Sequence, residues 1–148
     1  AGQADGRDVA ATLAIMAQMQ DREAEVLSPV AHAMTDVTGF GLAGHVHAIC
    51  KASGLDASLF RDAIPIYSGA RELSDAGVSS TLMPANSSDT PLNGAHDALL
   101  YDPQTAGGLL AAVPKKQSAA VIEALIGQGC TGHIIGHLTT GTGTLSLS

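Results

Sequence analysis

An acidic residue between two threonines is the strongest chemical signal in this chain. Asp36 follows Thr35 directly, Thr38 comes two residues later, and a glycine-rich turn leads into an apolar stretch at residues 42–52. This order predicts a strand that ends on a metal-binding acid and then turns into a helix. Free N–H groups and the helix dipole at such an N-terminus favour phosphate oxygens. The segment therefore predicts half of a nucleotide-phosphate site.

The spacing leaves two roles open for Asp36. Mg²⁺ prefers oxygen ligands, and a carboxylate at a strand end beside glycines can supply one. The same carboxylate could instead cap the following helix by accepting the N–H of Thr38 or Gly39, and the two roles are compatible. Gly39 and Gly41 resemble fragments of phosphate-cradling loops, but they also suit a tight strand-to-helix turn. Thr38 could face a phosphate or bond its own backbone.

A second polar segment, residues 102–108, interrupts an apolar region. Asp102 opens it, Gln104 and Thr105 offer hydrogen-bonding groups, and a Gly-Gly pair allows close approach of another part of the chain. A functional role and simple turn formation are both open here. The order of acid, threonine, two glycines and leucine echoes the order that follows Asp36.

Other catalytic patterns are not supported by the sequence. The chain has neither the G-x-x-x-x-G-K-[ST] nor the G-x-S-x-G pattern. His45 and His47 would point to different faces of a predicted helix, while His133 and His137 would lie too far apart along a strand to share one ion. A histidine zinc site is therefore disfavoured, and His45 is expected to be a packed residue behind the glycine turn.

The composition predicts one folded domain with a real core. The chain has 148 residues, of which 45% are hydrophobic. The net charge of −7 argues against nucleic-acid and anionic-membrane surfaces, but not against ATP, because Mg²⁺ can bridge acids to phosphates. Only 3% of residues are aromatic and none is Trp, which disfavours base stacking.

The cysteines and the absence of targeting signals predict a cytoplasmic protein. Cys50 and Cys130 lack metal-ligand spacing and are expected to be buried, reduced thiols. No signal peptide and no apolar run long enough to span a membrane is visible.

Periodicity and turn residues predict alternating helices and strands. Expected helices start near residue 5 or 8 and cover residues 22–27, 41–53, 66–76 and 117–128. Expected strands cover residues 30–35, 55–60, 98–101 and 109–113, with a terminal hairpin formed by residues 132–139 and 144–147. A long surface loop is expected at residues 77–97. Two strand–helix–strand arms, at residues 30–60 and 109–139, favour an α+β fold in which helices pack on a mixed β-sheet.

Two segments resemble the signatures of selenophosphate synthetase (selenide, water dikinase). Residues 35–45 read TDVTGFGLAGH and are similar to TDVTGFGLLGH, while residues 101–110 read YDPQTAGGLL and are similar to FDPQTSGGLL. The resemblance runs from Gly6 to Ile134 and corresponds to the C-terminal domain of that family. It implies the α+β fold of the aminoimidazole ribonucleotide synthetase superfamily. The departures are alanines, which replace Leu at position 43, Ser at 106 and a frequent Glu at 48.

The resemblance implies an enzyme that makes selenophosphate from selenide, ATP and water and releases AMP and phosphate. Residues 1–148 would be its single C-terminal domain. An N-terminal domain, absent from this sequence, would bring the reactive Cys or selenocysteine, a lysine and most metal-ligating acids. ATP and Mg²⁺ would lie between the domains of a homodimeric parent, and Asp36 would be a Mg²⁺ ligand. The residues expected near the phosphates or in a supporting loop are Thr38, Gly39, Gly41, Asp102, Gln104 and Thr105.

Two other interpretations remain open. The chain could belong to another ATP enzyme of the superfamily, from purine or thiamine metabolism, although Phe40 and residues 102–105 argue against this. It could also be a stand-alone binding domain without catalysis. On the first interpretation, the isolated fragment is expected to be inactive, because one carboxylate cannot assemble a polyphosphate–Mg²⁺ cluster.

Overall fold

The structure is a computed structural model that describes residues 2–148. Its helices are α1 (Gly6–Met16), α2 (Asp21–Leu27), α3 (Gly41–Ser53), α4 (Ala70–Asp75), α5 (Met83–Asp89) and α6 (Ser118–Gly127), with 3-10 turns η1 (Arg61–Ala63), η2 (Ala98–Tyr101) and η3 (Lys115–Gln117). Its strands are β1 (Ala33–Asp36), β2 (Leu55–Leu59), β3 (Leu92–Gly94), β4 (Leu109–Ala112), β5 (Gly136–Thr140) and β6 (Leu145–Leu147).

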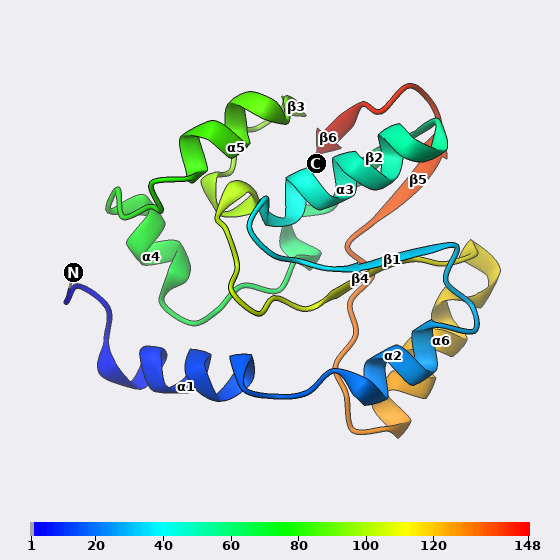
Figure 1. Cartoon of the computed structure of the whole chain (residues 1–148), viewed down its shortest axis with the longest axis horizontal. Helices are drawn as coiled ribbons and strands as arrows, with labels where there is room; N and C mark the ends of the chain where they lie inside the picture. The colour runs from blue at the N-terminus through cyan, green and yellow to red at the C-terminus, as the bar shows by residue number, and fades with distance from the viewer. Residues whose placement is uncertain (1) are drawn as a thin grey trace.

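The strands form two sheets, and helices pack on them (Figure 1). β1 and β4 make a two-stranded antiparallel ribbon in which Asp36 pairs with Leu109. The other four strands lie in the order β3-β6-β2-β5, with β5 antiparallel to β2 and the two remaining pairings parallel. The predicted α+β class with a mixed sheet is confirmed, and the ribbon stands beside that sheet as a second, smaller one.

The two strand–helix–strand arms predicted from the sequence are present as β1-α3-β2 and β4-α6-β5. Their strands pair with each other in the same order, β1 with β4 and β2 with β5, both antiparallel. Because the first signature segment follows β1 and the second precedes β4, this pairing brings both to one end of the ribbon. The fold thus accounts for the juxtaposition of segments that lie about 60 residues apart in the chain.

The predicted terminal hairpin is wrong. β5 and β6 do not pair with each other, because β2 lies between them and bonds to both. The turn that joins them crosses the start of β2, where Asp56 Oδ1 accepts the N–H groups of Thr142, Gly143 and Thr144 at 2.8, 3.1 and 2.8 Å. These hydrogen bonds, that of Thr144 first, lower the pKa of Asp56. The Asp56 carboxylate therefore holds the connection between β5 and β6, which the glycines had suggested would be a tight hairpin turn.

Three further predictions about elements are wrong or need shortening. The expected loop at residues 77–97 contains α5 and β3, with Pro84 in the first turn of the helix, where proline is tolerated. The expected strand at residues 98–101 is the turn η2, because the Asp97 side chain caps the N–H of Leu99 at 3.1 Å. The helix predicted at residues 66–76 covers only Ala70–Asp75.

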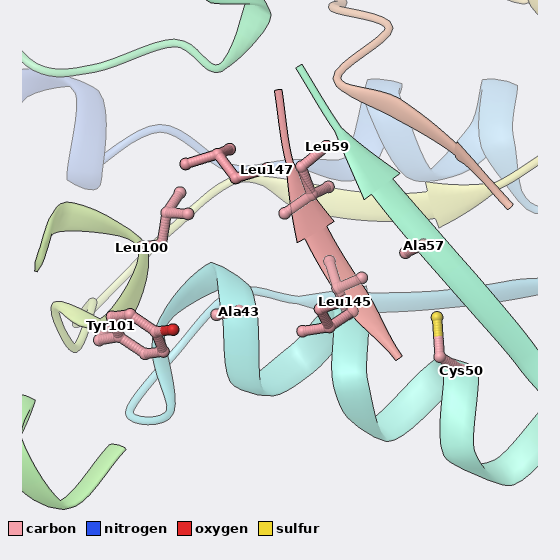
Figure 2. Packing of buried hydrophobic residues seen from close by; sticks show 9 residues of the cluster. Ala43, Cys50, Ala57, Leu59, Leu100, Tyr101, Leu145 and Leu147 are labelled. Atoms are coloured by element: carbon pink, nitrogen blue, oxygen red, sulfur yellow. The ribbon is translucent and has the colours of Figure 1, made fainter. Parts of the chain in front are cut away.

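Two apolar clusters hold the domain together. In the larger one, α3 packs against β2, β6 and η2, and Figure 2 shows Cys50, Ala57 and Leu145 meeting between these elements. The smaller one joins α2 to α6, which lie side by side in Figure 1, and includes Cys130. Both cysteines are buried and free, as predicted, and burial raises the pKa of the Cys50 thiol.

The remaining helices cover less of the core. α1 has no buried residue. Between residues 2 and 148, no helix combines the length and the apolar character needed to cross a membrane.

Candidate functional site

The structure places the two signature segments in direct backbone contact. The N–H of Val37 donates to Gly108 at 3.0 Å, and the N–H of Gly107 returns a bond to Val37 at 3.1 Å. One residue later, the N–H of Gln104 donates to the carbonyl of Thr38 at 3.0 Å. Two of the residues predicted from the sequence, Thr38 and Gln104, are therefore neighbours in space.

The glycines of these segments serve different purposes. Gly41 has a φ of 68°, and a Cβ there would lie 2.7 Å from the carbonyl oxygen of Leu100, so both conformation and space require glycine. A Cβ at Gly107 would collide with the carbonyl oxygen of Val37. A Cβ at Gly39, in contrast, would meet no atom within 4 Å. The fold explains Gly41 and Gly107, and it gives no packing reason for glycine at position 39.

His45 holds the turn after Asp36 from behind. The N–H of Thr38 donates to His45 Nε2 at 3.0 Å, and the Thr38 hydroxyl oxygen lies 3.3 Å from the same nitrogen. Because a backbone N–H can only donate, Nε2 carries no proton in this arrangement and the neutral ring is protonated at Nδ1. The ring also meets Phe40 edge-on at a centroid distance of 5.9 Å. His45 is a packed residue, as expected from the sequence.

Asp36 ends β1 with an exposed side chain. The capping role left open by the sequence does not occur at Thr38, whose N–H goes to His45 instead. α3 begins after Phe40 without a side-chain cap. Within residues 2–148, the Asp36 carboxylate accepts no hydrogen bond and forms no ion pair. The fold therefore makes no use of this charge.

Asp102 is the second acid of the site, and it is half-buried. Burial raises its pKa, and hydrogen bonds from the Ser80 backbone and the Gln104 side chain oppose that rise only in part. The Gln104 Nε2 atom lies 3.4 Å from Asp102 Oδ2 and 3.3 Å from the Asp102 carbonyl oxygen. Thr105 is exposed and lies at the outer side of this loop. Desolvation thus makes ionised Asp102 costly unless a cation approaches it.

Two amide side chains that sequence reasoning missed hold these loops. Asn86 Nδ2, on α5, donates to the carbonyls of Gly39 at 2.9 Å and Tyr101 at 3.0 Å. Gln20 Nε2, between α1 and α2, donates to the carbonyl of Gly107 at 2.6 Å. Neither amide lies in a recognisable motif, and Asn86 falls in the stretch expected to be a loop. No signal in one sequence could have found them.

The surroundings of the two signature segments contain no cluster of metal-ligating side chains among the residues that the structure describes, and the predicted site residues line neither of two cavities. Among residues 2–148, no group of three or more His, Cys, Asp or Glu side chains is placed to hold a metal ion. Two cavities, of about 630 and 460 Å³, are lined by none of the residues predicted for the site. Within the two signature segments, Asp36, Gly39, Phe40 and Thr105 are exposed, whereas Val37, Gly41 and Tyr101 are buried.

Comparison with known proteins identifies the type of domain. Residues 2–147 match the family model described as AIR synthase related protein, C-terminal domain. Selenide, water dikinase from Aeromonas hydrophila is 40% identical over 120 residues, covering 78% of this chain and 35% of that protein. The enzyme of the same name from Bdellovibrio bacteriovorus is 31% identical over 143 residues, covering 92% of this chain and 41% of its own length.

The chain thus spans only 35% and 41% of the length of these two curated relatives. A solved structure, that of the E. coli hydrogenase maturation protein HypE, superposes with a TM-score of 0.57 at 21% identity, over 80% of this chain and 32% of that one. At this identity, the match supports the fold alone. With the paired signature segments and the family match over residues 2–147, the chain belongs to the C-terminal domain family of AIR synthase related proteins and is similar to selenide, water dikinases.

Proposed function

We propose that the chain is the C-terminal domain of a selenide, water dikinase, which makes selenophosphate from selenide, ATP and water. In this proposal, Asp36 supplies one Mg²⁺ ligand to an ATP site that an N-terminal domain completes. The observation that carries it is the contact between the two signature segments, which leaves the Asp36 carboxylate exposed and unbonded at their junction. The similarity to several selenide, water dikinases supports the choice of reaction.

The donor set fits Mg²⁺ that is shared with a nucleotide. Mg²⁺ is commonly held by one or two carboxylates plus substrate phosphates, and it keeps several waters. One exposed carboxylate, with no three-residue metal cluster between residues 2 and 148, matches that use better than a closed protein cage. The other ligands would come from the triphosphate and from acids of the N-terminal domain. Bound Mg²⁺ would neutralise the phosphate charge that develops during transfer.

Thr38 has a narrower role in this proposal than its motif suggests. His45 Nε2 has one lone pair, which already accepts the Thr38 N–H at 3.0 Å, so the Thr38 hydroxyl, 3.3 Å away, can donate to that nitrogen only by sharing the same lone pair. Its oxygen lone pairs are then left to accept, which suits a metal-bound water and not a phosphate oxygen. The direct phosphate donors would be backbone N–H groups at the start of α3.

The apolar contact with the N-terminal domain would centre on Phe40. Its side chain is 67% exposed although it lies in the turn between Asp36 and α3. A large exposed aromatic beside an incomplete polar site is typical of a surface that another domain covers. ATP would bind between the two domains, and selenide would react in the part that this chain does not contain.

The test is Asp36→Asn in the full-length enzyme, with Asp89→Asn as the matched control. The Asp89 side chain is also exposed and forms no hydrogen bond or ion pair within the described chain. We expect selenide-dependent AMP formation to fall by about 100-fold or more in Asp36→Asn, because one electrostatic partner of the transferring phosphate is lost. The free energy of unfolding should change by less than about 0.5 kcal/mol in both variants.

Normal turnover in Asp36→Asn would remove the metal-binding role. The isolated chain should form no AMP at all, and measurable selenide-dependent AMP formation by residues 1–148 would contradict the division of the site between two domains.

A further inference from the structure

Asn86 joins the two signature segments through a single nitrogen atom. Its Nδ2 lies 2.9 Å from the Gly39 carbonyl oxygen and 3.0 Å from the Tyr101 carbonyl oxygen. Carbonyl oxygens only accept hydrogen bonds, so both partners require the nitrogen, and not the oxygen, of the amide at this position. A primary amide carries two N–H bonds, and each therefore has its own acceptor. Neither a hydroxyl nor a carboxylate could make both bonds.

The backbone that carries Asn86 is itself fixed. The Asn86 N–H donates to Leu82 at 3.0 Å, and its carbonyl accepts the N–H of Thr90 at 3.1 Å, so the residue lies inside the hydrogen-bonded turns of α5. Met83, on the same helix, packs against the larger apolar cluster. Thr90, at the end of the helix, is buried. The amide is therefore anchored to the core, whereas the turn that it contacts is exposed.

The bond to Gly39 sets the direction of a peptide plane. Because the peptide unit is planar and trans, fixing the Gly39 carbonyl also fixes the Phe40 N–H, which points the opposite way. That N–H donates to no other residue of the described chain. The turn around this peptide is closed by the Gly41 N–H, which donates to the Thr38 carbonyl at 3.0 Å, and Asn86 adds the side-chain hydrogen bond to the peptide between them. The amide thus helps to determine where an unpaired donor points, in the turn that follows Asp36.

We propose that Asn86 is a positioning residue for nucleotide phosphate. It orients the Gly39–Phe40 peptide so that the Phe40 N–H faces a phosphate oxygen, and it keeps the Tyr101–Asp102 peptide at a fixed distance from that turn. The phosphate part of this inference rests on the proposed function, whereas the coupling of the two loops does not. Asn86 acts through these peptides and touches no reacting atom.

The first test measures backbone amide hydrogen exchange in this chain. In Asn86→Ala, the N–H groups of Gly41 and Gln104, which both donate to the Thr38 carbonyl, should exchange about tenfold faster. The Phe60 N–H, which donates to the Ile135 carbonyl at the margin of the four-stranded sheet, should keep its rate. Asn93→Ala removes an exposed asparagine that makes no side-chain hydrogen bond among residues 2–148, and it should change none of these rates.

Asn86→Asp keeps the shape of the side chain but has no N–H to donate, so it serves if the alanine variant does not fold. It should raise the same two exchange rates. Unchanged rates at both sites, or an equal rise at Phe60, would overturn the coupling of the loops by Asn86.

The second test measures turnover by the full-length enzyme. In Asn86→Ala, the mispositioned N–H should lower kcat at least tenfold while the KM for ATP changes less than threefold, because the affected contact forms with the transferring phosphate. The thermal midpoint of the variant should stay at the wild-type value. Asn93→Ala should behave as wild type. A wild-type kcat in Asn86→Ala would overturn the positioning role. If the wild-type enzyme itself forms no AMP from selenide and ATP, the proposed function has failed, and the exchange rates still decide the coupling.

Discussion

Substituting alanine at each of two neighbouring glycines separates folding from function in the first signature segment. Gly41→Ala places a side chain on a residue with a φ of 68°, which costs about 1–2 kcal/mol. The new Cβ would also lie 2.7 Å from the Leu100 carbonyl oxygen and 2.9 Å from the Tyr101 Cα, both of which are backbone atoms. Relieving such overpacking costs about 1–3 kcal/mol. We therefore expect a loss of about 2–5 kcal/mol, a large part of the roughly 5–15 kcal/mol that holds a domain together.

Gly39→Ala is the matched comparison, two residues away. A Cβ there meets nothing within 4 Å, and the φ of Gly39 is not positive. Its effect on stability should lie within about 0.5 kcal/mol of zero, or be slightly stabilising because the unfolded chain loses freedom. Urea unfolding of the two variants, followed by circular dichroism, measures the difference. Equal destabilisation by both substitutions, or none by Gly41→Ala, would refute the steric explanation.

The Gly39→Ala variant also tests phosphate binding. If a nucleotide approaches the Gly39 backbone closely, Gly39→Ala should lower turnover of the full-length enzyme even though the domain stays stable. Wild-type turnover would leave Gly39 without a role in either folding or catalysis.

The acids provide two further predictions. Burial opposes ionisation of Asp97, but the hydrogen bond from Arg71 at 2.8 Å, the Leu99 N–H and the charges of Arg71 and Arg61 outweigh it and lower its pKa below 3.8. Asp97→Asn should therefore lower the free energy of unfolding by about 2 kcal/mol at pH 7. This is less than the cost of breaking a fully buried ion pair, because Arg71 stays partly exposed. The difference in urea midpoint between the wild type and Asp97→Asn should shrink as the pH falls below about 4. Burial raises the pKa of Asp102, so the folded state binds more protons than the unfolded state just above pH 3.8, and the stability of the domain falls as the pH rises through this range. Asp102→Asn should therefore raise the urea midpoint at pH 7 and leave it unchanged at pH 3. A lower midpoint at pH 7 would contradict this.

Local chemistry made part of the fold predictable. The bounds of α3 match the expected residues 41–53, because the apolar period is clear and Gly54, with a φ of 64°, ends the helix in the left-handed conformation. The two strand–helix–strand arms were visible for the same reason. The separation of β5 and β6 by β2, in place of the predicted terminal hairpin, was not predictable, since a carboxylate on β2 binds the turn from a site more than 80 residues away in sequence. α5 was also missed, because its residues, MPANSSD, have weak helix propensity and are held by tertiary contacts.

The candidate site shows the same division. Asp36, Thr38 and Gln104 could be proposed from the sequence because their types and order carry a chemical meaning without the structure, and their roles stay predictions. The different tasks of Gly39 and Gly41 could not be separated, because both look alike until the neighbouring backbone at Leu100 is known. Single amide side chains that donate hydrogen bonds to carbonyls of distant segments leave no recognisable pattern in the sequence.

The distribution of hydrogen bonds separates the groups that shape the two loops from the groups that are left for the proposed ligand. The carbonyls of Thr38 and Gly39 and that of Gly107 are bonded to groups of this chain, so the shape of both loops is set without a ligand. The Asp36 carboxylate is left over, and Asp102 is held where its charge costs stability. A fold selected for stability alone would gain by replacing Asp102 and would lose nothing by replacing Asp36. In the proposed function, Mg²⁺ bound between Asp36 and phosphate oxygens would use the free charge at Asp36, and any cation that approached Asp102 would relieve the cost of its burial. Stabilisation of the domain by Asp102→Asn, together with loss of turnover by Asp36→Asn, is therefore the combination of results that this arrangement requires.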